Sequence, residues 1–370
     1  MYEPDSVPPG QHGGEIVRLA RLLGCQPEDI LDFSNNADTL IFPLTEELIR
    51  TTPVPFAWYP DTTCSALAHD IAEHENVTPE QVIVANGSSE LVFLALSVLA
   101  PARALVIAPI FSEYVQACQR LGIPYELHVL KESNEFRLDE ADIRAIARRA
   151  DDMLILCTPA NPAGVADAGM TALLGQLRCR TVLADLAYRE FLHPDPAYAR
   201  DCHHRFAGQL SGSTELLSLG SFTKYFCCPG IRLGYGLGSA ALINRLQQRR
   251  APWMVSGFHE ALGRRFLEQL DAFRAARKDF SAQREAFRRG LLATGAFDRA
   301  NASDLNFIAA RLRPGLSGQA VFHHLLARRL LVRLCDAIPG MPANYLRMQI
   351  KTPAENALLY AALRDATQAF

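Results

Sequence analysis

The lysines of this chain limit where an amine could act as a nucleophile. Lysine occurs at four positions, and nearly all other positive charge is carried by arginine. Arginine stays protonated at neutral pH, so it cannot form an imine with a carbonyl compound. The candidates for amine chemistry are therefore the N-terminus and the four lysines, Lys131, Lys224, Lys278 and Lys351.

Lys224 differs from the other three in its surroundings. It lies in the almost uncharged segment 221–230, directly after an apolar run that predicts a buried strand. Desolvation there would lower the pKa of the amine and make it a competent nucleophile toward an aldehyde. We expect the other three, Lys131, Lys278 and Lys351, to be solvated surface charges. By itself such a lysine is more often structural, so the interpretation requires partner residues.

Candidate partners follow two other predicted strands. Asp185 comes directly after the apolar run 181–184, at the strand end where open α/β sheets bind ligands. A carboxylate there could keep a pyridine nitrogen protonated and make the ring an electron sink. Tyr188 and the Asn-Pro residue Asn161 could each donate a hydrogen bond to a phenolate oxygen on that ring. Taken singly, these residues are also compatible with ordinary caps and turns.

A phosphate group could be held by a second set of residues. Gly87 and Ser88 join a predicted strand to the start of a predicted helix, where backbone N–H groups bind anions. Ser221 and Arg232 flank the lysine and could add phosphate contacts. Phe111, which follows another predicted strand, could stack on an aromatic ring.

The order of the predicted elements places these residues on an α/β sheet. Between about residues 60 and 240, continuous apolar runs alternate with stretches of helical periodicity. Continuous hydrophobicity predicts strands buried on both faces, and hence a largely parallel sheet covered by helices. The predicted strands are Val82–Ala85, Ala104–Ala108, Met153–Cys157, Thr181–Ala184, Leu216–Leu219 and Leu233–Leu237, and the predicted helices lie near 88–99, 112–122, 139–150 and 167–177.

The pattern changes after residue 240. A long arginine-rich helical stretch leads into a part that mixes helices and short strands, as in an α+β domain with its own small core. Its predicted elements are a run at Phe307–Ala310, a helix near 318–329, short strands at Leu331–Leu334 and Tyr345–Ile350, and a last helix from about Pro353. The predicted divisions are an N-terminal arm with a substrate-site segment (1–40), a large domain (41–250), an interdomain helix (251–290) and a small C-terminal domain (291–370).

Composition argues against several classes of function. The formal net charge of −3 does not favour nucleic acid or an anionic membrane as a partner. The longest apolar run, 91–100, is about half of what a bilayer requires. The first 14 residues lack the pattern of a secretory signal. The nine cysteines are scattered and contain no CxxC pair, which favours reduced thiols in the cytoplasm, and we predict no metal site.

In their combination and order, these motifs resemble those of the fold-type I pyridoxal-phosphate enzymes of the class I and II aminotransferase superfamily. The similarity is to the branch of histidinol-phosphate aminotransferase and threonine-phosphate decarboxylase, and it extends over nearly the whole chain. It implies the aspartate-aminotransferase fold with a mostly parallel seven-stranded sheet. It also implies pyridoxal 5′-phosphate as the cofactor, held by Lys224 as a Schiff base. The residues that match the family's other cofactor contacts are Gly87, Ser88, Phe111, Asn161, Asp185, Tyr188, Ser221 and Arg232.

Two further motifs resemble elements of this family. Tyr59-Pro60-Asp61 is similar to the motif whose tyrosine reaches the cofactor of the neighbouring subunit. This similarity implies a homodimer with shared active sites, in which Tyr59 is a cofactor contact. Tyr345-Leu346-Arg347 resembles the element whose arginine binds the substrate carboxylate.

The finer resemblance favours the decarboxylase, through the segments 12–14, 31–36 and 331–340. It implies that O-phospho-threonine is bound by His12, Gly13, Asn36, Asn161, Arg333 and Arg347. An amino acid with a phosphate group requires two anion sites, and two arginines offer two bidentate donors. The sequence departs from the family pattern at Asp38, Thr39, Ala160, Ala163, Leu186 and Leu334. We expect most of these departures to lie outside the direct cofactor contacts or near the substrate side chain.

Three interpretations of the function are open at this point. The first is a decarboxylase of L-threonine O-3-phosphate or a close analogue, of the cobalamin side-chain type. The second is an aminotransferase resembling the histidinol-phosphate enzyme, which would require a 2-oxo acid acceptor. Both use the same residues, and they differ in which Cα bond lies perpendicular to the cofactor ring. The third, a non-enzymatic binding member of the fold, is disfavoured because Lys224, Asp185, Tyr188 and Arg232 are all intact.

Overall fold

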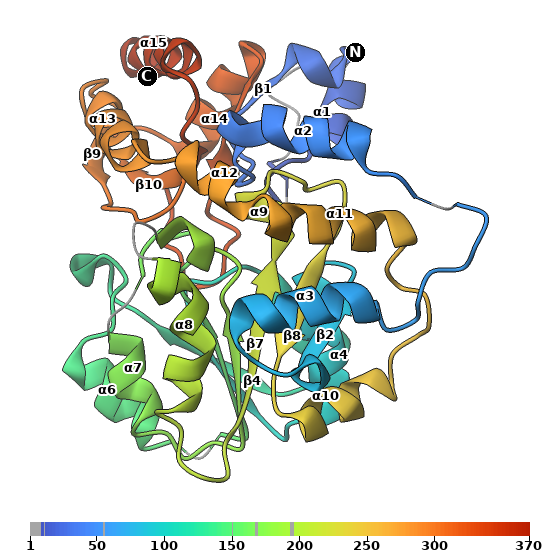
Figure 1. Ribbon diagram of the computed structural model, residues 1–370. Helices are drawn as coiled ribbons and strands as arrows, with labels where there is room; N and C mark the ends of the chain where they lie inside the picture. Colours follow the sequence, from blue (N-terminus) through green and yellow to red (C-terminus); the bar gives the residue numbers. More distant parts are fainter. Residues whose placement is uncertain (1–8, 11, 55, 150, 167–168, 193–195) are drawn as a thin grey trace. The chain divides into compact units, whose positions relative to one another are not determined.

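The computed structural model describes residues 9–370 except 11, 55, 150, 167–168 and 193–195 (Figure 1). The chain forms two compact units. The large unit comprises Ala37–Asn161 and Ala166–Lys278, and the small unit comprises Met1–Asn36, Pro162–Val165 and Asp279–Phe370. Among the described residues, no helix is both long enough and apolar enough to cross a membrane.

A seven-stranded sheet forms the centre of the large unit. In their order across the sheet, the strands are β2 (Val82–Ala85), β8 (Gly234–Leu237), β7 (Glu215–Ser221), β6 (Thr181–Asp185), β5 (Met153–Cys157), β3 (Ala104–Ala108) and β4 (Tyr125–Val129). Only β8 is antiparallel to its neighbours, and the other adjacent pairs are parallel. The mostly parallel sheet of seven strands is therefore confirmed.

The helices of the large unit precede, connect and follow these strands in the chain. They are η3 (Thr39–Ile41), α2 (Phe42–Thr51), α3 (Ser65–Glu75), η4 (Pro79–Gln81), α4 (Ser88–Leu99), α5 (Glu113–Arg120), η5 (Glu132–Asn134), α6 (Glu140–Ala147), α7 (Gly169–Leu174), η6 (Arg189–Leu192), α8 (Pro196–Ala207), α9 (Phe222–Tyr225), α10 (Ala240–Gln247), α11 (Gly257–Glu268) and α12 (Leu270–Ala275). Strand β4 was not predicted from the sequence. It is one of the two edge strands and, unlike β2 at the other edge, has no fully buried residue, so it lacks the continuous apolar run of the buried strands.

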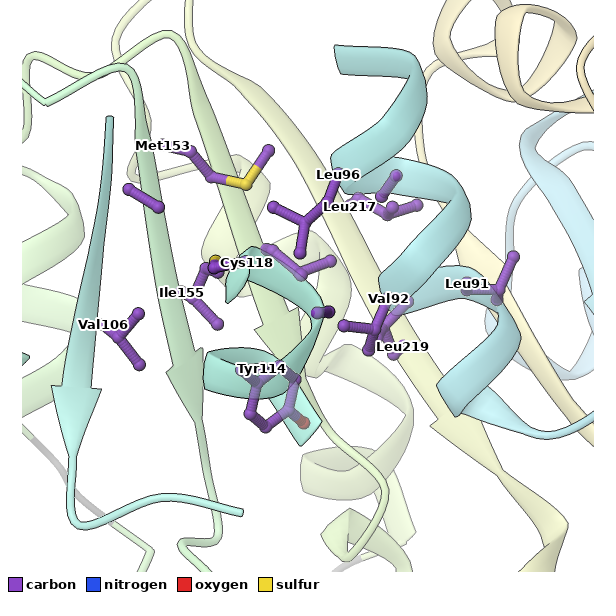
Figure 2. Close-up of a cluster of buried hydrophobic side chains, with 14 of the residues drawn as sticks. Leu91, Val92, Leu96, Val106, Tyr114, Cys118, Met153, Ile155, Leu217 and Leu219 are labelled. Atoms are coloured by element: carbon purple, nitrogen blue, oxygen red, sulfur yellow. The ribbon is translucent and has the colours of Figure 1, made fainter. Parts of the chain in front are cut away.

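The core of the large unit packs two helices against the sheet (Figure 2). Met153 and Ile155 of β5 and Leu217 and Leu219 of β7 belong to one buried cluster. The helical side of that cluster is lined by Leu91, Val92 and Leu96 of α4 and by Tyr114 and Cys118 of α5. Full burial of one such aliphatic side chain contributes about 1.5–3 kcal/mol, so this cluster fixes the positions of α4 and α5.

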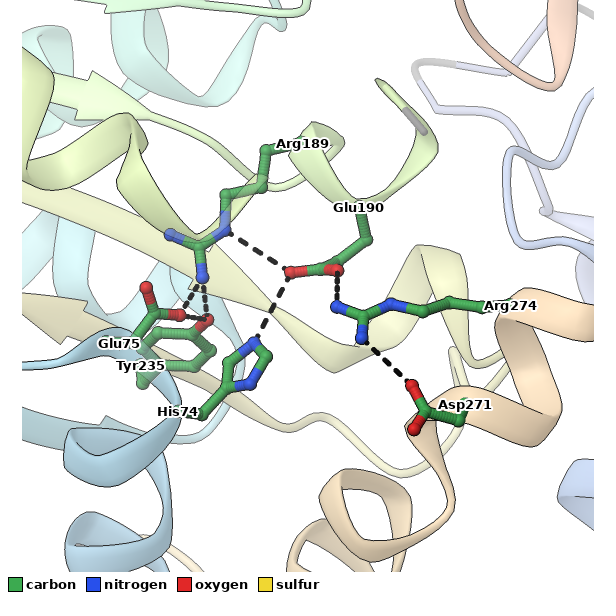
Figure 3. Close-up of polar contacts among 7 residues, drawn as sticks. All are labelled: His74, Glu75, Arg189, Glu190, Tyr235, Asp271 and Arg274. Carbon is green, nitrogen blue, oxygen red and sulfur yellow. Dashed lines mark hydrogen bonds and ion pairs between the residues drawn. The ribbon is translucent and has the colours of Figure 1, made fainter. Parts of the chain in front are cut away.

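A buried ionic network holds the turn after β6 (Figure 3). Arg189 of η6 is 2% exposed, and its guanidinium contacts the carboxylate of Glu75 at the end of α3. It also donates to the hydroxyl of Tyr235 on β8 at 2.5 Å. The next residue, Glu190, lies 3.8 Å from the His74 ring and 3.9 Å from the Arg274 guanidinium of α12. The turn that follows Asp185 is thus tied to α3, β8 and α12.

The small unit has the α+β character that the sequence predicted. Its antiparallel sheet has the order β12 (Arg333–Leu334), β13 (Tyr345–Gln349), β10 (Phe307–Leu312) and β9 (Phe297–Ala300), and β1 (Leu31–Asp32) pairs in parallel with β11 (Leu330–Leu331). Its helices are α1 (Ile16–Leu23), η2 (Pro27–Asp29), α13 (Phe280–Leu292), α14 (Gly318–Ala327) and α15 (Pro353–Ala369). The N-terminal segment thus pairs with a strand of the C-terminal part.

Two expectations from the sequence were wrong. The single helix expected over 251–290 is divided into α11, α12 and α13. Trp253 has a positive φ of 56°, and the hydroxyl of Ser256 caps α11 by accepting from the backbone N–H of His259 at 3.3 Å, so the helix begins later than expected. Lys351, expected at the surface, is buried with its amine 5.7 Å from the centre of the Phe33 ring.

The ionic network predicts how stability depends on pH. Burial alone would raise the pKa of Glu190, but His74, Arg189 and Arg274 outweigh burial and lower the pKa to about 2. The folded pKa is below the ordinary value of 4.5, so the stabilisation is fully present above about pH 4.5 and is lost as pH falls toward 2. Urea unfolding should therefore show that the free energy of unfolding of wild type falls relative to that of Glu190→Gln as the pH is lowered from about 4.5 toward 2.

A neighbouring glutamate provides the control for this measurement. Glu73 is exposed on α3, one residue from His74, so Glu73→Gln should stay within about 0.5 kcal/mol of wild type at every pH. If the difference in free energy of unfolding between wild type and Glu190→Gln does not change from pH 6 to pH 3, the lowered pKa of Glu190 is contradicted.

Candidate active site

Three parallel strands of the large unit end at one edge of the sheet and bring predicted residues together. Cys157 at the end of β5 pairs with Asp185 of β6, and Asp185 pairs with Leu219 of β7. Asn161 follows β5 after a short turn, and Lys224 lies on α9, directly after β7. The predicted lysine, carboxylate and amide therefore come from the carboxyl ends of adjacent strands, where open α/β sheets bind ligands.

The carboxylate of Asp185 is buried and accepts hydrogen bonds from two donors. The Tyr114 hydroxyl donates to Oδ2, and the backbone N–H of Ala187 donates to Oδ1 at 2.8 Å. Burial raises the pKa of Asp185 above its ordinary value, while the two hydrogen bonds and the charge of Lys224 act in the opposite direction. A buried carboxylate of this kind is well suited to pair with a protonated ring nitrogen.

Tyr114 was missed in the sequence analysis. It is 1% exposed in the first turn of α5, and burial together with the Asp185 charge raises the pKa of its hydroxyl well above the ordinary value. The hydroxyl therefore remains protonated and acts as a donor. Its partner lies 71 positions away, so the only sequence signal was its place three residues after Phe111.

Lys224 is half-buried on α9 among aromatic side chains. The rings of Phe222, Tyr225 and Phe226 around it are all buried. The Ser221 hydroxyl caps this short helix by accepting from the backbone N–H of Thr223 at 3.2 Å. The segment is thus as apolar as the sequence predicted. By contrast, Lys131 is exposed in an ion pair with Asp139, and Lys278 is exposed.

The start of α4 and the side chain of Arg232 form an anion-binding cradle. Gly87 caps α4 with a positive φ of 74°, and a β-carbon on it would overlap the Arg232 guanidinium. A β-carbon on Gly234 would lie 2.6 Å from the backbone nitrogen of Ser88. Backbone N–H groups at a helix N-terminus and a guanidinium converge here, which is the arrangement that binds a phosphate group. The described residues therefore fit the phosphate of the implied cofactor.

The other predicted cofactor residues lie at different positions in the large unit. Tyr188 is 4% exposed in the turn after β6, and Phe111 contacts Tyr114 edge-on with ring centres 6.2 Å apart. Tyr59 instead lies at the surface, 84% exposed, and its ring packs on Trp253 with centres 5.0 Å apart. Leu186, where the family has an acidic residue, is 1% exposed and belongs to the buried part of the turn.

Two buried arginines lie side by side in the small unit. Arg333 of β12 and Arg347 of β13 are register partners, and each is 5% exposed. Arg347 donates to the backbone carbonyl of Ser34 at 2.6 Å, and Arg333 donates to the carbonyl of Gly10. Burial and the Arg347 charge lower the pKa of Arg333. Two adjacent guanidinium groups with like charge favour a bound anion between or beside them.

The segment 10–36 folds against these arginines. A β-carbon on Gly13 would overlap the Ser34 carbonyl and approach the Arg347 guanidinium to 3.0 Å, so only glycine fits this position. His12 and Arg333 line the same small cavity of the small unit. Asn36 is buried, and its carbonyl accepts from the Asn306 amide at 2.8 Å. The structure thus places His12 beside Arg333 and Gly13 beside Arg347, while Asn36 contacts Asn306.

The departures from the family pattern at Asp38, Thr39 and Leu334 fall in both units. We expected all three near the substrate side chain. Leu334 lines the same cavity as Arg333. Asp38 and Thr39 belong to the large unit, where Asp38 is fully buried and forms an ion pair with Arg277. The aspartate carries its own counter-charge, which explains how the chain accommodates it.

Comparison with known proteins assigns the family. The sequence profile described as "Aminotransferase class I and II" matches residues 32–363. Threonine-phosphate decarboxylase of Salmonella typhimurium is 29% identical over 365 residues, which cover 96% of each chain. Histidinol-phosphate aminotransferase of Desulfitobacterium hafniense is 25% identical over 345 residues, which cover 91% of this chain and 92% of that protein.

A solved structure of the same fold agrees with this assignment. The structure of a decarboxylase from Sulfurospirillum multivorans aligns with a TM-score of 0.85 at 20% identity, covering 98% of this chain and 95% of that one. The chain belongs to the class I and II aminotransferase family, an enzyme family with the aspartate-aminotransferase fold and pyridoxal 5′-phosphate as its cofactor. The fold, the class of enzyme and the cofactor implied by the sequence are therefore confirmed.

The anion cradle can be tested by adding a β-carbon at one glycine inside it and at one glycine outside it. Gly87 and Gly122 both have a positive φ, 74° and 66°, but a β-carbon on Gly122 would meet no atom within 4 Å. Gly87→Ala should therefore displace Arg232 and weaken pyridoxal-phosphate binding by at least about tenfold, since losing a charge-assisted hydrogen bond costs about 1.5–3 kcal/mol. Equilibrium dialysis measures the affinity.

Gly122→Ala is the control for a β-carbon at a positive φ outside the cradle. It should cost about 1 kcal/mol in stability while leaving cofactor affinity unchanged. Equal cofactor affinity in the two variants would mean that Gly87 and Arg232 do not hold the phosphate.

Proposed function

We propose that this enzyme decarboxylates a phosphorylated amino acid, L-threonine O-3-phosphate or a close analogue. The observation that carries the proposal is the pair of buried, register-matched arginines, Arg333 and Arg347. A substrate with both a carboxylate and a phosphate supplies two anions, one for each guanidinium. The similarity to threonine-phosphate decarboxylase over nearly the full length supports the same substrate class.

The residues of the large unit would bind and orient the cofactor. In this proposal Lys224 holds it covalently, and Gly87, Ser88, Ser221 and Arg232 bind its phosphate. Asp185, fixed by Tyr114, pairs with the ring nitrogen and keeps it protonated. Phe111 stacks on the ring, and Tyr188 and Asn161 donate to the ring oxygen. Bound pyridoxal 5′-phosphate supplies an electron sink for the bonds of the substrate Cα.

The residues of the small unit would bind the substrate. Arg347 takes the α-carboxylate, and Arg333 takes the distal phosphate together with His12, Gly13 and Asn36, while Asn161 adds a contact. Loss of carbon dioxide leaves the bonding electron pair at Cα, and a proton must then be delivered to that carbon. The Lys224 side chain, in its protonated ammonium form, would be the group suited to deliver this proton and would be left as the neutral amine.

Transamination by a histidinol-phosphate type enzyme is the alternative function. It is favoured by the relative of that name that aligns over 91% of this chain. It would use the same residues, with the Cα–H bond rather than the carboxylate perpendicular to the ring. Binding of the substrate by an arginine at each end is compatible with decarboxylation and with transamination. Only an assay of the reaction can distinguish the two.

Release of carbon dioxide without an acceptor separates the two reactions. Purified enzyme with cofactor and O-phospho-threonine, in the absence of any 2-oxo acid, should release one carbon dioxide per substrate consumed. Consumption that requires a 2-oxo acid and yields the corresponding amino acid would instead identify an aminotransferase and overturn the proposed reaction.

Assembly as a cytoplasmic homodimer is part of the same proposal. Large apolar side chains are exposed around Tyr59: Phe56 is 84% exposed, Trp58 77% and Trp253 50%. A group of exposed aromatic residues of this kind is typical of a protein interface. None of the nine cysteines, all of which lie in the described part of the chain, is in a disulfide, which is compatible with a reducing compartment. We further propose a role in the synthesis of the cobalamin side chain, which follows from the proposed substrate.

The two arginines should differ in their effect on substrate choice. Arg347→Leu should impair every amino-acid substrate, because each has an α-carboxylate. Arg333→Leu should reduce kcat/KM for O-phospho-threonine more than tenfold beyond its effect on threonine, since an anion left without its partner costs about 2–5 kcal/mol. Steady-state kinetics with both substrates measure the ratio. An equal loss for phosphorylated and plain substrates would contradict the distal-phosphate assignment.

A further inference from the structure

Asp38 lies directly beside the backbone of Lys224. Its own backbone N–H donates to the carbonyl oxygen of Lys224 at 2.9 Å. The side chain begins η3, where Oδ1 accepts from the backbone N–H of Leu40 at 3.4 Å. Asp38 is fully buried, so its carboxylate requires a counter-charge within the protein.

Arg277 supplies that counter-charge. Its guanidinium contacts Oδ2 of Asp38, and the two side chains are 8% and 1% exposed. The guanidinium also lies over two aromatic rings, 4.4 Å from the centre of Phe191 and 5.3 Å from the centre of Tyr225. Tyr225 follows Lys224 in the chain, and Phe191 packs against Tyr188 with ring centres 6.1 Å apart. Arg277 therefore contacts the chain neighbour of Lys224 and the ring that packs against Tyr188.

The pair is balanced in charge only when both members are present. Removing one member of a buried ion pair leaves the other as an uncompensated charge in a low-dielectric region. That charge would act on Lys224, whose backbone carbonyl accepts from Asp38, because electrostatic interactions are weakly screened inside the protein.

We propose that Asp38 and Arg277 are a positioning pair for Lys224, which fixes the backbone of α9 and keeps the local field around the amine neutral. The pair acts through Lys224 and does not contact the substrate, and its catalytic relevance rests on the proposed role of Lys224. Neither residue is among those that the sequence analysis assigned to cofactor or substrate.

Other charged or titratable groups also act on Lys224. Asp185 interacts with its charge from the end of β6. The Cys228 thiol, whose pKa is raised by burial, interacts with both Lys224 and Arg232. These groups are unchanged in variants at positions 38 and 277, so a change in Lys224 reactivity in those variants reports the pair alone.

The test measures the reactivity of Lys224 in the full chain without cofactor. Competitive acetylation followed by peptide mass spectrometry gives the pH midpoint at which Lys224 becomes reactive. Asp38→Asn leaves the positive charge of Arg277 and should lower the midpoint by on the order of one pH unit. Arg277→Gln leaves the negative charge of Asp38 and should raise it by a similar amount. The double variant should return to the wild-type midpoint.

A buried carboxylate at the opposite end of the sheet is the matched control. Asp151 is 5% exposed near the start of β5 and pairs with Arg103 and Arg149. Asp151→Asn should destabilise the chain without moving the Lys224 midpoint. The proposal would be overturned if the Lys224 midpoint shifted in the same direction in both single variants, or did not shift in either. Loosened packing alone would not move the midpoint in opposite directions.

Folding of the variants provides a second readout. If a single variant does not fold, the proposal requires that the double variant restores folding, as measured by circular dichroism, with the wild-type midpoint. A double variant that also fails to fold would overturn the charge-matched pair. The acetylation assay uses no cofactor, so its result does not depend on whether the proposed function is correct. Failure of wild-type Lys224 to bind pyridoxal 5′-phosphate would refute that function and leave the electrostatic result intact.

Discussion

Burial of the Asp185 carboxylate at the end of β6 is the constraint on which the large unit depends. Such a group is costly unless donors surround it, and the fold supplies Tyr114 from α5 and the backbone of Ala187. Tyr114 belongs to the same core cluster that packs α4 and α5 on the sheet. The packing that stabilises the unit therefore also positions the donor to Asp185 and the N-terminus of α4, where the phosphate cradle lies.

Charge pairing in the interior follows one rule in the large unit and another in the small unit. In the large unit, Glu75 is matched by Arg189 and Asp38 by Arg277, so each of these two buried pairs is neutral. In the small unit, strand pairing instead sets Arg333 and Arg347 next to each other. Like charges in adjacent positions are costly, and an anionic substrate would relieve that cost. We therefore propose the small unit as the place where an anionic substrate binds.

The sequence predicted the features that depend on local patterns. Strands such as β3 and β5 were predicted with their observed bounds because continuous apolar runs mark strands buried on both faces. Edge strand β4 was missed because it is half-solvated. The partnership of Tyr114 with Asp185, and of Arg277 with Asp38, joins distant positions and leaves no local signal. Lys351 was expected at the surface, since sequence alone does not show the Phe33 ring beneath it.

Covalent trapping of the cofactor tests the central claim most directly. Borohydride reduction of the enzyme loaded with pyridoxal 5′-phosphate, followed by peptide mapping, identifies the lysine that carries it. The account predicts one pyridoxyl group per chain on Lys224, because this amine is half-buried at the strand edge beside Asp185. Stoichiometric labelling of the buried Lys351, or of the exposed Lys131 or Lys278, would contradict it.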